Sequence, residues 1–428
     1  MKLKFKQFDR KINNPKTFYG LPKEVKFCSS CTYSNQKPNS ELEYKHSIKK
    51  KKPIISFDEK NVCSACKIIG KKKKIDWKER EKLLIDLCNK YRKNNGEYDC
   101  LVPGSGGKDS MFASHILKYK YRMNPLTVTC APHIYTDWGK KNFESWIASG
   151  FDNYLLTPNK KVQRLLTRLA LENIFHPFQP FMMGQMYIPP KIALKFNIKL
   201  IFYGENPTEY GNQSDEDENS KKDLKYFSTE DNKNIYISGL SLKELKKFNL
   251  SELDLINYFP PLKSEIIKEK IDVRYLGYFL PWHPQKNFYY VTENCNFMPA
   301  PERSAGTYSK YSSIDDKMDD LHYYTTYIKF GIGRATYDSS QEIRNNELLR
   351  DEGIKLVRKY DGEYPLRFEK EVFDYLTISK EEFGNVYKKF KNPIFDRSYF
   401  KDLSNKFRSP HLWYCDKVSE KFILRHKI

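Results

Sequence analysis

The residues best suited to chemistry are six consecutive ones at positions 105–110, Ser-Gly-Gly-Lys-Asp-Ser, which we call the phosphate loop. Its glycines let the backbone approach phosphate oxygens closely, and the helix expected after it presents free amides to an anion. It is not a Walker loop, because Lys108 is followed by Asp109 and not by Ser or Thr, and it lacks the Gly-x-Gly-x-x-Gly spacing. Asp109 is placed to hold Mg²⁺ on the phosphates, and Lys108 adds a positive charge. We expect the nucleotide phosphates to be bound by Ser105, Gly106, Gly107, Lys108, Asp109 and Ser110.

Four of the nine cysteines form two Cys-x-x-Cys pairs, Cys28 with Cys31 and Cys63 with Cys66. A tetrahedral zinc ion takes four soft ligands, and each pair supplies two thiolates from one turn. A closed four-cysteine site holds a segment folded without taking part in a reaction, so we expect structural Zn²⁺ here. A redox or cluster role and unrelated thiols stay open as alternatives. We expect the tip of the long loop between the pairs, with its lysine run and Pro53, to project from the module.

The composition restricts the class of protein. The 428 residues carry 75 basic and 54 acidic side chains, and the resulting net charge of +21 attracts polyanions. Lysine outnumbers arginine 59 to 16, whereas nucleic-acid readers depend on arginine as much as on lysine, so we treat most of the charge as surface and expect no nucleic-acid partner. No stretch has the ~18 consecutive apolar residues of a membrane span, and the first residues lack a signal-peptide core. We expect a cytoplasmic protein with reduced cysteines and no membrane partner.

The phosphate loop requires a scaffold, and the surrounding sequence predicts alternating strands and helices. A buried strand at residues 98–102 precedes the loop, and a helix at 109–121 follows it. Further strands are expected at 126–130, 153–156 and 199–203, and further helices at 76–93, 140–149, 160–171 and 187–196. This alternation predicts an α/β fold with a doubly wound parallel sheet.

Changes in composition predict four regions along the chain. Residues 1–75 form the expected four-cysteine zinc-binding module, which we call the zinc module. Residues 76–211 form the α/β domain that holds the phosphate loop. Residues 212–265 interrupt the alternation with an acidic run and lysine-rich stretches, which indicates an insertion. Residues 266–428 are rich in aromatic side chains and helical patterns, and we expect them to contact the substrate or a partner.

The segment Ser-Gly-Gly-x-Asp-Ser after the first strand resembles the PP-loop ATP pyrophosphatase superfamily. The resemblance implies that the loop grips the phosphates of ATP that leave as pyrophosphate, with Mg²⁺ bound. In that superfamily the adenine lies along the end of the second strand, so the resemblance implies contacts at Thr129 and Cys130.

Later segments resemble one branch of this superfamily, the N-acetyl sugar amidotransferases of bacterial surface-glycan pathways. The segment at residues 203–211, Tyr-Gly-Glu-Asn-Pro-Thr-Glu-Tyr-Gly, is similar to that family's pattern after its fourth strand. Further similar segments lie at residues 306–311, 315–317, 327–336, 342–344 and 361–365. The resemblance runs from about residue 25 to about residue 390, apart from the insertion.

This resemblance implies conversion of a sugar acetamido group to an acetamidino group. ATP adenylates the amide oxygen, and ammonia then replaces it. Lys108 and Asp109 would act in catalysis together with Glu205 and Asn206, which follow a strand at the edge where such sheets bind ligands. Glu205 and Asn206 would orient the substrate or ammonia, and a part in loop structure stays open as the alternative. The substrate would be an N-acetylated sugar or nucleotide-linked sugar. Any carboxylate on it would pair with Arg303 or Arg334, although ordinary salt bridges are nearly as well supported for both.

Ammonia needs a source, and the chain shows no glutaminase signature. Lys2 stands where a glutaminase would carry cysteine, and no cysteine has the Gly-x-Cys-x-Gly setting of a nucleophile elbow. We therefore predict a separate glutaminase subunit, as the resemblance also implies.

Two alternatives belong to other classes. A PP-loop enzyme that thiolates tRNA would use the basic surface and the zinc module to grip RNA. No cysteine lies between Cys130 and Cys295, which counts against thiolation, although some thiolating enzymes take sulfur from a partner. A catalytically silent nucleotide-binding or scaffold protein is the second alternative.

Overall fold

The computed structural model describes residues 5–46, 51–212, 220–416 and 418–428, and its centre is a five-stranded parallel sheet. The strand order is β3-β2-β1-β4-β7, so strands are added on both sides of β1 and the chain crosses over between them. The strands are β1 (Cys100–Pro103), β2 (Pro125–Cys130), β3 (Asn153–Leu156), β4 (Leu200–Tyr203) and β7 (Asp272–Tyr275).

Helices cover both faces of this sheet, because side chains alternate along each strand. Leu101 and Ile201 pack in one apolar cluster with Ile188 and Ile192 of α6, while Cys100 and its neighbours pack in another cluster on the opposite face. The helices around the sheet are α2 (Trp77–Tyr91), α3 (Lys108–His115), α4 (Asp137–Ala148), α5 (Lys160–Ile174), α6 (Gln179–Lys195) and α10 (Leu276–Phe279). The predicted doubly wound parallel sheet is confirmed.

Two elements differ from the sequence expectations. Helix α6 begins at Gln179 and not at residue 187, since Pro180 fits a first helical turn and Gly184 lies inside the helix against Cys130. The strand β7 was not expected, because it is short and its polar Asp272 and Arg274 alternate with buried residues. The sheet therefore continues past the predicted insertion, and the four domain limits stay a prediction.

The segment that was expected to be an insertion is folded against α5 and α6. Its elements are β5 (Tyr236–Ile237), β6 (Leu240–Ser241), α7 (Leu242–Lys246), α8 (Glu252–Leu255) and α9 (Lys263–Lys268). Ile237, Leu245 and Leu255 are buried in a cluster with Leu166 of α5 and Tyr187 of α6. The acidic run at residues 214–218 lies outside the described residues.

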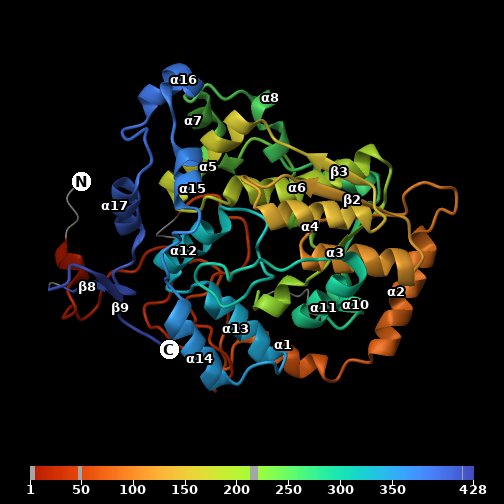
Figure 1. Cartoon of the computed structure of the whole chain (residues 1–428), viewed down its shortest axis with the longest axis horizontal. Coiled ribbons are helices and arrows are strands. Elements are labelled where there is room, and N and C mark those ends of the chain that lie inside the picture. The colour runs from red at the N-terminus through yellow and green to blue at the C-terminus, as the bar shows by residue number, and fades with distance from the viewer. Residues whose placement is uncertain (1–4, 47–50, 213–219, 417) are drawn as a thin grey trace.

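The C-terminal region is mainly helical, as expected, and closes on the N-terminal segment. Its elements are α11 (Pro284–Cys295), α12 (Asp319–Phe330), α13 (Arg334–Arg344), α14 (Arg350–Tyr360), α15 (Glu369–Leu376), α16 (Lys380–Phe383), α17 (Arg397–Phe407), β8 (Trp413–Cys415) and β9 (Phe422–Leu424). Phe8 and Tyr19 pack with Leu412 and Trp413, so the two ends of the chain lie together (Figure 1). No helix within the described ranges is both long and apolar enough to cross a membrane.

Candidate active site

A cavity of about 710 Å³ opens where β1 and β4 end. The phosphate loop and Glu205 form one side of it, and α12 and the first turns of α13 form the other. Ligands bind at this edge in doubly wound sheets, because loops from neighbouring strands separate there. The N-terminal module also contributes to the lining through residues 38–41, Glu43 and Lys52.

Glycines set the shape of the phosphate loop. Gly106 has a φ of +87°, and a Cβ there would lie 2.7 Å from Cα of Phe143. Gly107 is the N-cap of α3 in an extended conformation, and a Cβ there would meet nothing closer than 3.9 Å. The hydroxyl of Ser110 donates to the carbonyl of Gly107 over 3.0 Å. The loop thus delivers the first amides of α3 into the cavity.

Lys108 and Asp109 form the charged pair of this loop. Nζ of Lys108 lies 2.5 Å from Oδ2 of Asp109, and the lysine side chain is buried. Oδ1 of Asp109 is buried with no hydrogen-bond partner in the described part of the chain. An unpartnered carboxylate oxygen beside a phosphate loop suits Mg²⁺, which prefers oxygen ligands and binds through one or two carboxylates. The residues present therefore fit the predicted ion.

Glu205 faces the loop from the end of β4. Burial, with the negative charge of Asp109 adding to it, raises the pKa of Glu205 to about 7. Nε2 of Gln341, from α13, donates to Glu205 at 3.5 Å and to the hydroxyl of Tyr210 at 3.3 Å. A carboxylate with this pKa can exchange a proton near neutral pH.

Three of the predicted site residues do not present their side chains to the cavity. Oδ1 of Asn206 accepts from the amide and the hydroxyl of Thr208 at 3.0 Å each, so it caps the short helix that follows. The hydroxyl of Thr129 accepts from Asn153 inside the sheet, and Cys130 is buried with its pKa raised to about 12 by burial. Only the backbone of Thr129 and Cys130 remains for an adenine contact.

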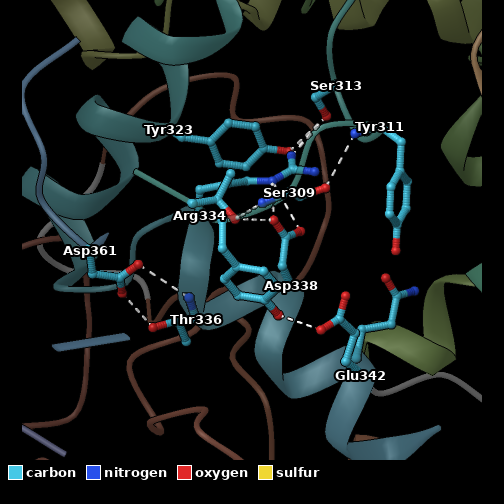
Figure 2. Close-up of polar contacts among 12 residues, drawn as sticks. Ser309, Tyr311, Ser313, Tyr323, Arg334, Thr336, Asp338, Glu342 and Asp361 are labelled. Atoms are coloured by element: carbon cyan, nitrogen blue, oxygen red, sulfur yellow. Dashed lines mark hydrogen bonds and ion pairs between the residues drawn. The ribbon is translucent and has the colours of Figure 1, made fainter. Parts of the chain in front are cut away.

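The two arginines predicted to bind substrate have different surroundings. Arg303 directs its fork to Glu363, with N···O distances of 2.5 and 2.7 Å, and does not line the cavity. Arg334 lines the cavity and is buried, and Figure 2 shows it between Ser313, Tyr323 and Asp338.

The contacts of Arg334 hold it in place. Its Nε donates to Asp338 at 3.1 Å, one terminal nitrogen donates to Ser313 at 2.8 Å, and the guanidinium lies 4.3 Å from the ring centroid of Tyr323. Burial alone would lower the pKa of Arg334, but the charge and hydrogen bond of Asp338, together with Tyr323 and the charge of Asp319, outweigh it and raise that pKa above the usual value.

Three aspartates that were not predicted as site residues also line the cavity, Asp315, Asp316 and Asp319. Ser105 of the phosphate loop and Asp315, in the segment before α12, line the same cavity. Burial, followed by the charges of Asp315 and Asp316, raises the pKa of Asp319 well above its usual value. Two of these residues fall in a segment with family resemblance, but that pattern did not indicate their role.

The opposite end of the cavity, which we call the far end, is formed by His176, His322, Lys329 and Glu43. Nζ of Lys329 contacts Glu43 at 2.6 Å and the carbonyl of Ile174 at 2.9 Å. Lys329 lies ten positions after Asp319 on α12, or about 15 Å along the helix axis. Lys329 falls in the segment 327–336 with family resemblance, but that pattern does not indicate its role. No motif marks the other three residues, because the four come from three separate segments.

The four predicted zinc ligands converge. The sulfur atoms of Cys28, Cys31, Cys63 and Cys66 all lie within 4.8 Å of one another, and two pairs are separated by 3.9 and 3.7 Å. A regular tetrahedron with Zn–S bonds of ~2.3 Å has S···S edges of about 3.8 Å, so the cluster fits zinc. It is the one metal-ligating cluster of three or more His, Cys, Asp or Glu found within the described ranges.

The zinc module supports α13, which carries Arg334 and Gln341. The hydroxyl of Thr32 lies 2.9 Å from that of Ser339 and 2.7 Å from that of Ser340. Residues 38–46, which precede the expected projecting tip, pack inward, because Glu43 is buried beside the cavity. Lys52, in the lysine run of that tip, also lines the cavity. Residues 47–50 of that loop lie outside the described residues.

Comparison with known proteins gives one family match and three partial likenesses. Residues 305–425 match the model of the C-terminal domain of WbpG-like LPS biosynthesis proteins. This range contains the C-terminal segments from residue 306 to residue 365 and confirms the resemblance predicted from them. An uncharacterised protein of Methanocaldococcus jannaschii is 35% identical over 83 residues, which are 19% of this chain and 29% of that protein. The match thus spans less than a third of that relative.

Two solved structures are also similar. The NMN synthetase from Francisella tularensis has a TM-score of 0.32 at 10% identity, over 71% of this chain and 98% of that one. A predicted subunit of a tRNA methyltransferase from Methanocaldococcus jannaschii has a TM-score of 0.24 at 14% identity, over 56% of this chain and 90% of that one. At these TM-scores neither likeness bears on function.

Proposed function

We propose that this protein is an ATP-dependent amidotransferase that converts the acetamido group of an N-acetylated sugar to an acetamidino group in bacterial surface-glycan biosynthesis. One observation carries the proposal: a single cavity combines the phosphate loop, an unpartnered oxygen of Asp109 and the carboxyl group of Glu205. The family match of residues 305–425, which supply the opposite wall, supports a role in glycan biosynthesis.

The proposed reaction has two steps. The amide oxygen of the sugar attacks the α-phosphorus of ATP, the bond to pyrophosphate breaks, and AMP becomes attached to the former carbonyl oxygen. Ammonia then adds to the carbon, its nitrogen loses a proton, and the C–O bond breaks as AMP leaves with that oxygen. The loop amides and Lys108 stabilise the charge on the departing pyrophosphate, since they are fixed before the reaction begins.

Glu205 supplies the proton acceptor of the second step. Its pKa of about 7 leaves a large fraction ionised at neutral pH, and it lines the same cavity as Asp109, which supports this role. Gln341 and Tyr210 orient it from α13 and from the segment after β4. Asp109 would hold Mg²⁺, which neutralises phosphate charge when bound.

The ammonia would come from a separate glutaminase subunit. None of the cysteines in the described ranges lines the cavity, so the site itself offers no thiol to hydrolyse glutamine. This supports delivery from outside the chain.

The proposal is tested with purified protein, ATP, Mg²⁺ and three probes, N-acetylmannosamine, UDP-N-acetylglucosamine and N-acetylneuraminic acid. Ammonium salts should give a product in which NH replaces one oxygen, detected by mass spectrometry, together with AMP and pyrophosphate. Glutamine alone should give none. Formation of amidine from glutamine alone would contradict the separate subunit, and absence of product from every probe with ammonium would contradict the proposed reaction.

A further inference from the structure

The far end of the cavity contains two imidazoles that lack protein partners. His176 lies between α5 and α6, and His322 lies on α12, yet their rings stack with centroids 5.0 Å apart and an interplanar angle of 25°. No ring nitrogen of either histidine has a hydrogen-bond partner in the described part of the chain. The two Nδ1 atoms are closed off by burial, so Nε2 is the nitrogen left for a ligand in the cavity.

These imidazoles are neutral at physiological pH. Burial, followed by the positive charge of Lys329, lowers the pKa of His176 to about 3, and burial also lowers the pKa of His322 well below its usual value. A neutral imidazole has one N–H donor and one acceptor nitrogen. Hydroxyl and acetamide groups also combine a donor with an acceptor, so they match such a pair, whereas an anion would need a cation.

Aromatic rings form part of the wall around the two histidines, beside the charged Lys329 and Glu43. Phe178 lies 4.6 Å from the ring centroid of His322, and Phe181 and Tyr323 line the same space. Pockets of this kind, with apolar walls and a few placed polar groups, bind small organic ligands. Residues 38–41 and Glu43 of the zinc module close this end. Glu43 forms an ion pair with Lys329 at 2.6 Å and another with Lys52 at 3.1 Å.

Two simpler explanations do not account for the pair. A metal site would need a third ligand, and the search of the described residues finds no cluster of three that includes His176 or His322. Purely structural histidines are normally hydrogen-bonded, as His411 is here to Ser409 at 2.6 Å and to Gln36 at 3.0 Å. His176 and His322 lack such partners and border a cavity.

We propose that the far end is the acceptor subsite, in which Nε2 of His176 and of His322 hydrogen-bonds hydroxyl groups or a non-reacting acetamido group of the sugar ring. This subsite rests on the proposed function, and it specifies where the sugar is held and which groups hold it. The sugar ring lies against Phe178 and Tyr323, and its reacting acetamido group points along α12 towards Asp109 and Glu205.

The test measures binding separately from turnover. Binding of N-acetylmannosamine, UDP-N-acetylglucosamine and N-acetylneuraminic acid to the full chain is followed by calorimetry, without ATP and with a non-hydrolysable ATP analogue. His322→Phe keeps a stacked ring but removes both nitrogens, and His322→Gln restores a polar group near Nε2. We expect His322→Phe to weaken binding of the best probe at least tenfold and His322→Gln to recover most of that affinity. In both variants the affinity for the ATP analogue should stay within twofold of the wild type.

His115→Gln is the matched control, because His115 contacts Tyr290 at 2.9 Å and does not line the cavity. It should leave probe binding unchanged. If no probe binds the wild type, or if His322→Phe binds probes like the wild type, the subsite is disproved. Probe binding that depends on His322 without any amidine product would instead contradict the proposed reaction and leave the subsite standing.

Discussion

The two ends of the cavity are constructed in different ways. The phosphate loop is one run of six residues that acts largely through backbone amides, and its shape depends on Gly106 in a left-handed conformation. The far end consists of side chains from the zinc module, from the segment before α6 and from α12. Backbone amides in this geometry bind a phosphate group whatever ligand carries it, whereas a sugar requires side chains in particular positions.

The two ends of the cavity also differ in the charge of their side chains. Asp109, Glu205 and Lys108 place ionisable groups at the loop end, where charge develops in the proposed reaction. At the far end, burial keeps His176 and His322 neutral, and Glu43 forms ion pairs with Lys329 and Lys52. Substitutions at the loop end should therefore change the rate, and substitutions at the far end should change acceptor affinity.

The largest effect is expected at Asp109. Asp109→Asn removes the charge that would hold Mg²⁺ and should lower kcat/KM with ammonium by about 10³-fold, the scale for loss of a group that stabilises developing charge. Circular dichroism and thermal unfolding should match the wild type. Asp137→Asn, at the exposed N-terminus of α4, is the control and should be fully active. An active Asp109→Asn variant would refute the assigned role.

The next effect concerns Glu205 and pH. With a folded pKa of about 7, Glu205 is protonated below that pH and ionised above it, so the rate per free ammonia should rise between pH 6 and pH 8 and then level off. Glu205→Gln should lose about 10²-fold in rate and show no inflection near pH 7. The profile is measured at saturating ATP and acceptor. An unchanged inflection in the variant would assign the titration to another group.

Gly106 tests whether backbone geometry determines the loop end. Gly106→Ala forces a Cβ to 2.7 Å from Cα of Phe143 at a φ of +87° and should lower the free energy of unfolding by about 2 kcal/mol and weaken ATP binding. Gly107→Ala, which has room, should cost less than about 1 kcal/mol. Urea unfolding and nucleotide titration distinguish the two. Equal costs would argue against a strained loop.

Removal of zinc should affect the far end more than the loop end. Cys63→Ser should release the ion, loosen the wall at residues 38–43 and the support of α13, and weaken acceptor binding about tenfold, while ATP binding stays within about threefold. Metal analysis and calorimetry measure both. Cys415→Ser, outside the cluster, is the control. Equal loss at both ends would show that the module supports the whole fold.

The smallest effect is expected at Arg303. Its fork is engaged by Glu363 outside the cavity and is partly exposed, so Arg303→Ala should change kcat/KM less than twofold and the free energy of unfolding by no more than about 1 kcal/mol. Arg334→Lys should raise the KM for acceptor several-fold, because a lysine cannot keep both the contact to Asp338 and the contact to Ser313. The opposite order would reverse the roles of the two arginines.

How far the sequence alone predicts a residue's role differs from one residue to the next. The role of Asp109 as a Mg²⁺ ligand is a prediction that its neighbours alone suggest, because a loop between a strand and a helix has few possible shapes. Asn206 was predicted from a segment and caps a helix, since an asparagine after a strand suits either role. Nothing in the sequence separated Arg303 from Arg334, because each has acidic residues nearby and only packing decides which pair forms.

The sequence by itself determined the phosphate loop, the four cysteines and the alternation that yields a parallel sheet, because each depends on residues close together in the chain. The tertiary structure alone decided that β7 joins the sheet, that the zinc module lines the cavity, and that His176 meets His322 across 146 positions of sequence. Contacts of that range depend on how the helices pack on the sheet, and no local pattern records them.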